Sequence, residues 1–518
     1  MKFFLQLLIL VTSLAQAQNV IVSNGSSITI EKTSSLTTTG SFFNSGTVTL
    51  SSDGHEFASV IVNGEASGNI IYKRYVNPAG AGEWDLIGSP VNDLAISDFA
   101  SRNSGSIAVS GNQYGIGTYD NTTGTWINFS TSTIDEAGNF DIGKGYQMAS
   151  RNGEALVFTG TIATTNQLQS IINNDAANSG AGKRWNLIAN PFPSYMYAND
   201  DAHPTDNFLT VNSDKLDDTY EAIYGYNADG SGYTAYNHAY SSDTPVYLAP
   251  GQGFMIAADN TNADTISFTE DMQTIFGGDE YLAGRSVNIL GLEIILKLYH
   301  GAEEIETAKL YFKEGLTLGL NPGYDAGSYN QNAAIMSRLV EEDQGHGLAI
   351  NAMGLESMYT TIIPLVIHQE EGESFKVVLA SYTVPEDVKV YLEDVQLGTM
   401  TYLNTTDFEL TAENRLSEVG RFYIHLAEGT LSTEEVKTNS LNAFKPNYSE
   451  FITVEGLLQQ DRIIKVKLYN ILGREVISTS LNNTTNTQII STKGLATGIY
   501  ILKLVSGTNE LTKKLFIR

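Results

Sequence analysis

The sequence predicts an all-β protein built of several domains, and three observations support this prediction. Short runs alternate apolar and polar residues, as in Ile464, Val466 and Leu468 against Lys465 and Lys467. Gly, Asn-Gly and Ser-Gly turn signals separate these runs. A chain of 518 residues without cysteine exceeds one core and depends on packing for its stability. We therefore expect tandem β-sandwich or jelly-roll-like domains.

Residues 1–17 have the pattern of a secretory signal peptide. Lys2 supplies the positive charge, and Phe3 to Leu14 form an apolar run that is too short to span a bilayer. Ala15 and Ala17 fit the small-residue cleavage rule, so we expect the mature chain to begin at Gln18. An uncleaved membrane anchor, the alternative, would need a longer apolar run.

Residues 18–76 combine short strands with small polar turns. We expect strands at Val20–Val22, Ser27–Ile30, Gly46–Leu50 and Ser59–Val62. Their spacing and their Ser and Thr content predict two or three rungs of a β-solenoid-like segment. An antiparallel meander is the alternative, and spacing alone does not exclude it.

Residues 77–275 form a β-rich domain with two copies of an internal repeat. Trp84–Pro90 recurs as Trp185–Pro191, Tyr119–Trp126 as Tyr226–Tyr233, and Gly143–Tyr146 as Gly251–Phe254. The offsets of 101, 107 and 108 make the copies colinear, with a longer loop in the second copy that we place in the acidic run Asp200–Asp218. The Trp segments predict buried strands ended by proline, and the Tyr segments predict hairpins.

Residues 285–429 predict a second β-sandwich, and residues 430–445 predict a linker. The expected strands are Leu292–Tyr299, Lys309–Phe312, Thr360–Ile367, Phe375–Ser381 and Phe422–Leu426. We expect one short helix at Ile335–Glu341.

Two candidate ligand sites stand out in the repeat region. The first is the acidic loop with Asp200, Asp201 and Asp206, whose carboxylates suit Ca²⁺. It lacks the Asp-x-Asp-x-Asp-Gly framework, so we prefer a solvated loop and expect no cofactor, with Ca²⁺ as the alternative.

The second candidate is an aromatic face formed by the two hairpins. Tyr119 with Trp126, and Tyr226 with Tyr233, are expected to be cross-strand neighbours. Such rings could contact sugar rings, whereas the alternative, which we prefer, is structural pairing within each hairpin.

The search for enzymatic chemistry finds no catalytic residue. There is no His-Glu-x-x-His, no Gly-x-Ser-x-Gly and no phosphate-binding loop. A carboxylate pair assembled from distant strands would leave no local motif, so a glycosidase stays an alternative. The net charge of −28 argues against nucleic acid or an anionic membrane as a partner.

The last 73 residues, 446–518, differ from the rest of the chain in charge and predict a small Ig-like β-sandwich. They carry nine basic and five acidic residues, so the preceding 445 residues have a net charge of −32. Four short motifs follow one another here, and their residues are Pro446, Asn447, Leu468, Tyr469, Gly473, Arg474, Gly498, Tyr500, Lys513 and Lys514. In this order the motifs resemble the type A sorting domain of the type IX secretion system, although Tyr448 replaces the second proline of its usual Pro-Asn-Pro opening.

The resemblance implies an export route and a set of partners. It implies passage through the periplasm to the outer cell surface or the medium, removal of the domain by a sortase-like processing enzyme, and attachment to surface lipopolysaccharide or release. The Trp-x-Leu-Ile and Gly-x-Gly-aromatic units also resemble repeats of large surface proteins exported by this route. We therefore expect a non-catalytic adhesin, glycan-binding or matrix protein. A secreted polysaccharide-degrading enzyme is the alternative.

Overall fold

The computed structural model describes most of the chain as β-structure. It describes residues 15–80, 84–175, 182–227, 232–239, 245–259, 264–279, 292–428, 442–445, 451–455, 457, 463–470, 474–482, 484–485, 487–496, 498–507 and 509–517. Within these ranges the α-helices are α1 (Ile96–Arg102) and α2 (Phe208–Asn212). The all-β prediction is confirmed. The chain divides into two compact units, Met1–Leu426 and Ala427–Arg518. The apolar run predicted for the signal peptide lies outside the described residues.

The first nine strands form a short parallel β-solenoid. Its three stacks are β1 (Ala15–Ala17), β4 (Ser35–Thr38) and β7 (Ser59–Val62); β2 (Val20–Val22), β5 (Phe42–Asn44) and β8 (Ala66–Ser67); and β3 (Ser27–Ile30), β6 (Thr47–Ser51) and β9 (Ile70–Val76). Every pairing within these stacks is parallel, which excludes the antiparallel meander. Phe42, Val48 and Val60 fill its interior.

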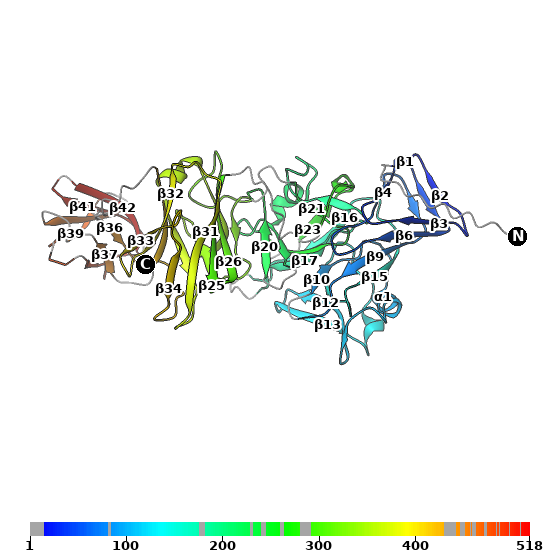
Figure 1. Ribbon diagram of the computed structural model, residues 1–518. Coiled ribbons are helices and arrows are strands. Elements are labelled where there is room, and N and C mark those ends of the chain that lie inside the picture. Colours follow the sequence, from blue (N-terminus) through cyan, green and yellow to red (C-terminus); the bar gives the residue numbers. More distant parts are fainter. Residues whose placement is uncertain are drawn as a thin grey trace. The chain divides into compact units, whose positions relative to one another are not determined.

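The solenoid shares a sheet and a core with the first repeat. Strand β9 pairs along its whole length with β15 (Glu154–Gly160), as Figure 1 shows. Val48 and Tyr72 of the solenoid belong to the same hydrophobic cluster as Phe99 and Phe158 of the repeat. The border expected at residue 76 therefore falls inside one packed body.

The two repeat copies fold into sheets with the same strand order. In the first copy β10 (Asp85–Ile87), β14 (Tyr146–Met148), β12 (Gln113–Asp120) and β13 (Thr125–Ser130) are neighbours in that order. In the second copy the order is β17 (Trp185–Ala189), β22 (Gly253–Ala257), β19 (Ile223–Tyr226) and β20 (Tyr233–Tyr236). In the first copy β9 also pairs with β15, and in the second β16 (Gln167–Ile171) pairs with β23 (Asp264–Phe268). The segments that correspond in the sequence therefore lie at the same positions in two sheets of the same strand order.

A helix-ending asparagine recurs in both copies and was missed in the sequence. Asn103 donates to the carbonyl of Phe99 and accepts from the amide of Val157. Asn212 makes the same two bonds, to the carbonyl of Phe208 and from the amide of Ser267. These bonds fasten each helix end to a strand.

The matching helices also locate the longer loop of the second copy. Phe99 and Phe208 are 109 residues apart, whereas Trp84 and Trp185 are 101 apart. The extra length therefore precedes Phe208 and includes β18 (Tyr195–Tyr197), and only its end overlaps the acidic run proposed from the sequence.

The two copies contact each other through equivalent residues. Ile87 bridges to Gln252 of the second copy, and its equivalent Ile188 bridges to Lys144 of the first. Such reciprocal pairing is the pattern of an isologous interface with approximate two-fold symmetry. A Cβ atom on Gly145 would lie 2.6 Å from Leu187 Cγ and 2.8 Å from the carbonyl oxygen of Ile188. Close approach between the copies therefore explains the second glycine of the Gly-x-Gly motif, whereas the first, Gly143 or Gly251, has a positive φ.

The rest of the first unit is one curved sheet of eleven strands. Along the sheet the order is β33 (Thr399–Tyr402), β32 (Val388–Asp394), β35 (Phe422–Glu428), β30 (Ile362–Ile367), β28 (Ile335–Ser337), β29 (Leu348–Met353), β26 (Glu303–Phe312), β25 (Leu292–His300), β31 (Ser374–Tyr382) and β34 (Phe408–Thr411), with β27 (Ala326–Gly327) paired to β29. Strands β33 and β34 are consecutive in the chain yet lie at opposite ends of this order. The sheet therefore curls around a single core, in which Phe375 contacts Phe408 and Phe422.

The short helix predicted at Ile335–Glu341 is wrong. Ile335–Ser337 forms β28, which pairs with β29 and β30. Ile335 and Met336 point to opposite faces of the sheet, and both are buried. A strand covered on both faces reads as a continuous apolar run, which has no alternation to distinguish it from a helix.

The second unit is a small two-sheet sandwich, as predicted. One sheet contains β36 (Asn442–Phe444), β37 (Phe451–Glu455) and β40 (Gln488–Ser491), and the other contains β39 (Glu475–Leu481), β38 (Ile464–Asn470), β41 (Gly498–Ser506) and β42 (Asn509–Ile517). Ile464, Val466 and Leu468 are fully buried between them. Ala443 of β36 is also buried, so the linker expected over residues 430–445 ends before Asn442.

Candidate functional site

The four aromatic residues of the candidate ligand face lie as cross-strand pairs in two equivalent hairpins. Tyr119 of β12 lies opposite Trp126 of β13, with ring centroids 5.1 Å apart in an edge-to-face arrangement. Tyr226 of β19 lies opposite Tyr233 of β20, with centroids 5.2 Å apart. The predicted registers are therefore present in both copies.

The pair in the second copy is covered by another aromatic residue. Tyr329, from the loop between β27 and β28, stacks on Tyr233 with ring centroids 4.0 Å apart. Trp185 contacts Tyr329 in turn at 4.5 Å. Burial raises the pKa of the Tyr233 hydroxyl well above its usual value. The geometry favours a structural role for Tyr226 and Tyr233.

The pair in the first copy leaves an aromatic side chain in solvent. Trp126 is 36% exposed, whereas Tyr119 is partly buried against the cluster that contains Trp185 and Leu187. The hydroxyl of Tyr119 donates to the carbonyl of Gly182 at 2.7 Å, and burial raises its pKa to about 12. Tyr119 thus anchors the hairpin, and Trp126 lies beside it as an accessible ring.

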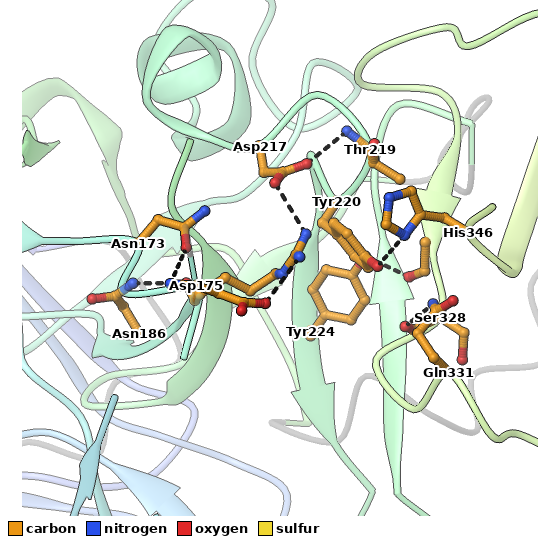
Figure 2. A network of polar contacts seen from close by, with 12 residues as sticks. Asn173, Asp175, Asn186, Asp217, Thr219, Tyr220, Tyr224, Ser328, Gln331 and His346 are labelled. Carbon is orange, nitrogen blue, oxygen red and sulfur yellow. Dashed lines mark hydrogen bonds and ion pairs between the residues drawn. The ribbon is translucent and has the colours of Figure 1, made fainter. Parts of the chain in front are cut away.

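A network of polar contacts surrounds Arg184, and Figure 2 shows its members Asp175, Asp217 and Tyr220. The Arg184 guanidinium donates to Asp175 and to Asp217, at 3.2 Å each, and lies over the ring of Tyr220 at 4.7 Å. The hydroxyl of Tyr220 is 3.2 Å from Nδ1 of His346, so the network links the second repeat to the loop before β29. The Arg184 side chain is only 8% exposed and is paired on both sides, which indicates a structural role.

Burial controls the protonation of this network. It raises the pKa of Asp217 despite the opposing charge of Arg184, and it raises the pKa of Tyr220 to about 12. Burial, and secondly the charge of Arg184, lower the pKa of His346. His346 is therefore held neutral at pH 7, consistent with its hydrogen bond to a neutral tyrosine.

The acidic loop does not assemble into a cation site in the part of the chain that the structure describes. Asp200 Oδ1 is 2.7 Å from Nδ1 of His238, and Asp206 is 3.3 Å from Nδ1 of the neighbouring His203. No group of three His, Asp or Glu residues that could hold a metal ion occurs among the described residues. The calcium alternative, including Asp201, therefore gains no support from the geometry.

The sorting motifs lie mostly in the inner strands β38 and β41 and in the turn after β38. Leu468 is buried while Tyr469 is half-buried, and the amide of Arg474 donates to the Asn470 side chain across the turn. Tyr500 is buried, and its hydroxyl donates to the carbonyl of Ala496 at 2.8 Å.

The remaining sorting residues lie in β41 and β42 or outside the described residues. Gly498 pairs with Ile517, and Lys513 and Lys514 lie in β42 opposite Leu502 and Ile501. Pro446, Asn447 and Gly473 lie outside the described residues.

Two family models together match most of the chain. One, described as a domain of unknown function (DUF8693), matches residues 5–426. The chain belongs to this family. The other, described as a secretion system C-terminal sorting domain, matches residues 446–518 of this DUF8693 protein.

The sorting-domain match establishes the export route of the DUF8693 protein. It is exported by the type IX secretion system and carries a C-terminal sorting signal, which implies processing by that machinery and delivery to the cell surface or the extracellular space. Among the described residues, no helix has the length and apolarity that a membrane span needs.

The curated proteins and the solved structures give no further indication of function. No curated protein matches the chain. One solved structure, a tetra-tandem repeat in the extending region of a large adhesion protein, has 9% identity and a TM-score of 0.11 over 79% of this chain and 92% of that chain.

Sequence reasoning missed the buried polar groups that join the repeats to the eleven-stranded sheet. None of Arg184, His346 and Glu221 belongs to a sequence motif, and His346 is more than 100 residues from the other two. The fold brings them together where the second repeat meets the loops of the eleven-stranded sheet. An isolated arginine directly before a repeated Trp was the one local signal available for the network.

Proposed function

We propose that the DUF8693 protein is a non-catalytic binding protein of the cell surface or its surroundings, and that it contacts glycans through Trp126. Type IX export delivers the chain to the cell surface or the extracellular space, and we take polysaccharide there as its partner. The observation that carries the proposal is the hairpin of the first copy, where Trp126 is 36% exposed and is oriented edge-to-face by Tyr119.

The asymmetry between the two copies supports this assignment. At the equivalent place in the second copy, Tyr233 is stacked under Tyr329. The first hairpin thus has an accessible indole, whereas the equivalent ring of the second hairpin packs against Tyr329. An indole held by its neighbours offers a large apolar contact area at low entropic cost, which suits the face of a sugar ring.

Three aspartates of the repeat region are paired with basic side chains. Arg184, Asp175 and Asp217 satisfy one another within the network, and Asp200 pairs with His238. These carboxylates therefore have structural partners. Hydrolysis by a carboxylate pair is the alternative function.

Retention on immobilised polysaccharides tests the binding site. We expect the purified protein to be retained by at least one matrix among alginate, laminarin, chitin and agarose, and Trp126→Ala to abolish that retention with little change in the melting temperature. Ile127→Ala is the matched control, because Ile127 is 50% exposed on the opposite face of the same strand. Equal loss with both variants, or retention by Trp126→Ala, would contradict the proposed site.

A further inference from the structure

A buried carboxylate without a partner lies where the second repeat meets the loop at residues 320–327. Glu221 lies two residues before β19 and is only 6% exposed. Its carboxylate has no hydrogen bond or ion pair with any residue that the structure describes. Burial disfavours the ionised form of this carboxylate, because it removes most of the surrounding water and no donor replaces it among the described residues.

The loop passes directly over this carboxylate. A Cβ atom on Gly323 would lie 3.2 Å from Glu221 Oε1 and 3.0 Å from Cδ2 of His238. The amide of His238 donates to the carbonyl of Gly323 at 2.9 Å, and the side chain of Asn237 donates to the carbonyl of Asp325 at 3.0 Å. These two bonds connect the second repeat to the loop beside Glu221.

The charges around Glu221 come from three segments. On its own segment the negative charge of Asp218 acts on it, and from the segment after β20 His238 acts on it with the opposite sign. His238 is itself paired with Asp200, which also feels the charge of Lys313. Lys313 donates to the hydroxyl of Tyr324 in the loop at 2.9 Å.

We propose that Glu221 makes this contact pH-sensitive: the protonated carboxyl allows the loop at residues 320–327 to close on the second repeat, and its ionisation loosens the loop. The burial that carries this inference also raises the pKa of Glu221 to about 7 from an ordinary value of 4.5. The closed form therefore binds the proton more tightly than an open form in which Glu221 meets water. The contact is fully stable below about pH 4.5 and weakens as the pH rises through 7.

Hydrogen exchange of the mature protein at pH 5 and pH 8.5 tests the proposal. After correction for the intrinsic exchange rate, protection of the amides at residues 237–239 and 321–327 should fall on the order of tenfold to a hundredfold at the higher pH, the change expected from this linkage. Glu221→Gln, a neutral residue of the same shape, should remove the change. Unchanged protection in the wild type would overturn the proposal.

Two further variants separate Glu221 from general effects of pH. Glu306→Gln is the matched control, because burial also raises the pKa of Glu306 to about 7 on β26, and this variant should keep the local change in protection. Asp218→Asn removes a charge that raises the pKa of Glu221, so the midpoint of the change should move to lower pH. An unmoved midpoint, or a loop whose pH dependence persists in Glu221→Gln, would refute the role of Glu221.

Discussion

At the scale of single residues, several carboxyl groups are buried where their ionised form is unfavourable. Burial raises the pKa of Glu221, Glu306 and Asp325 to about 7. Asp325 is compensated in part by the amides of Ala352 and Asn321, which donate to its carboxylate. In each group the folded state binds a proton more tightly than the unfolded chain does.

These groups predict that stability falls as the pH rises. Stabilisation by a raised carboxyl pKa is fully present below about pH 4, the ordinary value, and is lost as the pH passes through 7. We expect the melting temperature to decrease from pH 5 to pH 8.5, and Glu306→Gln to reduce the slope. A thermal melt series by circular dichroism measures this, and a melting temperature that rises over the same range would contradict it.

The tyrosine pair of the second copy gives a second prediction at this scale. Tyr226→Ala combined with Tyr233→Ala should lower the free energy of unfolding by roughly 2–5 kcal/mol, the order found when large aromatic groups leave a packed site. Trp126→Ala should cost much less because its ring is more exposed. Urea denaturation measures the free energy of unfolding of both variants. A double variant as stable as the wild type would contradict a structural role for the Tyr226–Tyr233 pair under Tyr329.

At the scale of elements, the two copies of the repeat are held together by small residues at their shared boundary. The Gly-x-Gly pieces contact the Trp-containing strands of the opposite copy. A Cβ atom on Gly253 would lie 2.7 Å from the backbone of Leu86, and one on Gly145 would meet both the Leu187 side chain and the backbone of Ile188. The requirement is for space, since Gly145 does not adopt a positive φ.

Gly145→Ala should therefore be strongly destabilising. Its new Cβ would overlap with Leu187 and with the backbone of Ile188, and overpacking of this kind costs about 1–3 kcal/mol. Gly105→Ala is the control, because a Cβ there has no atom within 4 Å, and its effect should stay within about 0.5 kcal/mol. Denaturant midpoints decide the comparison; equal effects would mean that the boundary is not tightly packed.

Strand positions and the repeat could be predicted from the sequence because both depend on local patterns. Ser27–Ile30 and Ser59–Val62 were predicted with their observed bounds, since apolar alternation and turn residues mark both ends. The partner of each strand could not be predicted. Nothing local shows that β9 pairs with β15, and the buried strand β28 carries no period that distinguishes it from a helix.

In the candidate site, too, contacts within a hairpin could be predicted from the sequence and contacts between distant segments could not. Cross-strand pairing of Tyr119 with Trp126 followed from the length of the turn between them. The covering of Tyr233 by Tyr329 could not be foreseen, because 96 residues separate the two. The burial of Glu221 could not be foreseen either, because Gly323, which lies beside its carboxylate, is 102 residues away in the sequence.

At the scale of the whole molecule, the chain combines a large passenger with a small unit that directs its export. The first unit, Met1–Leu426, and the second, Ala427–Arg518, have separate hydrophobic clusters. The linker was expected over residues 430–445, of which residues 430–441 lie outside the described residues. Separate cores allow the passenger to keep its fold when the sorting unit is removed.

Deletion of residues 446–518 should block export without unfolding the passenger. We expect the truncated protein to accumulate in the periplasm with Gln18 as its first residue, and its melting transition to persist. Cell fractionation with N-terminal sequencing measures both. Normal amounts of the truncated protein on the cell surface would contradict the assignment of the sorting signal.

The central claim is that the passenger binds polysaccharide without cleaving it. Incubation of the purified protein with soluble and immobilised polysaccharides, followed by measurement of both retention and new reducing ends, tests this claim most directly. We predict retention that depends on Trp126 and no increase in reducing ends over a buffer control. An increase in reducing ends that follows protein concentration would contradict the claim and establish a polysaccharide-degrading enzyme.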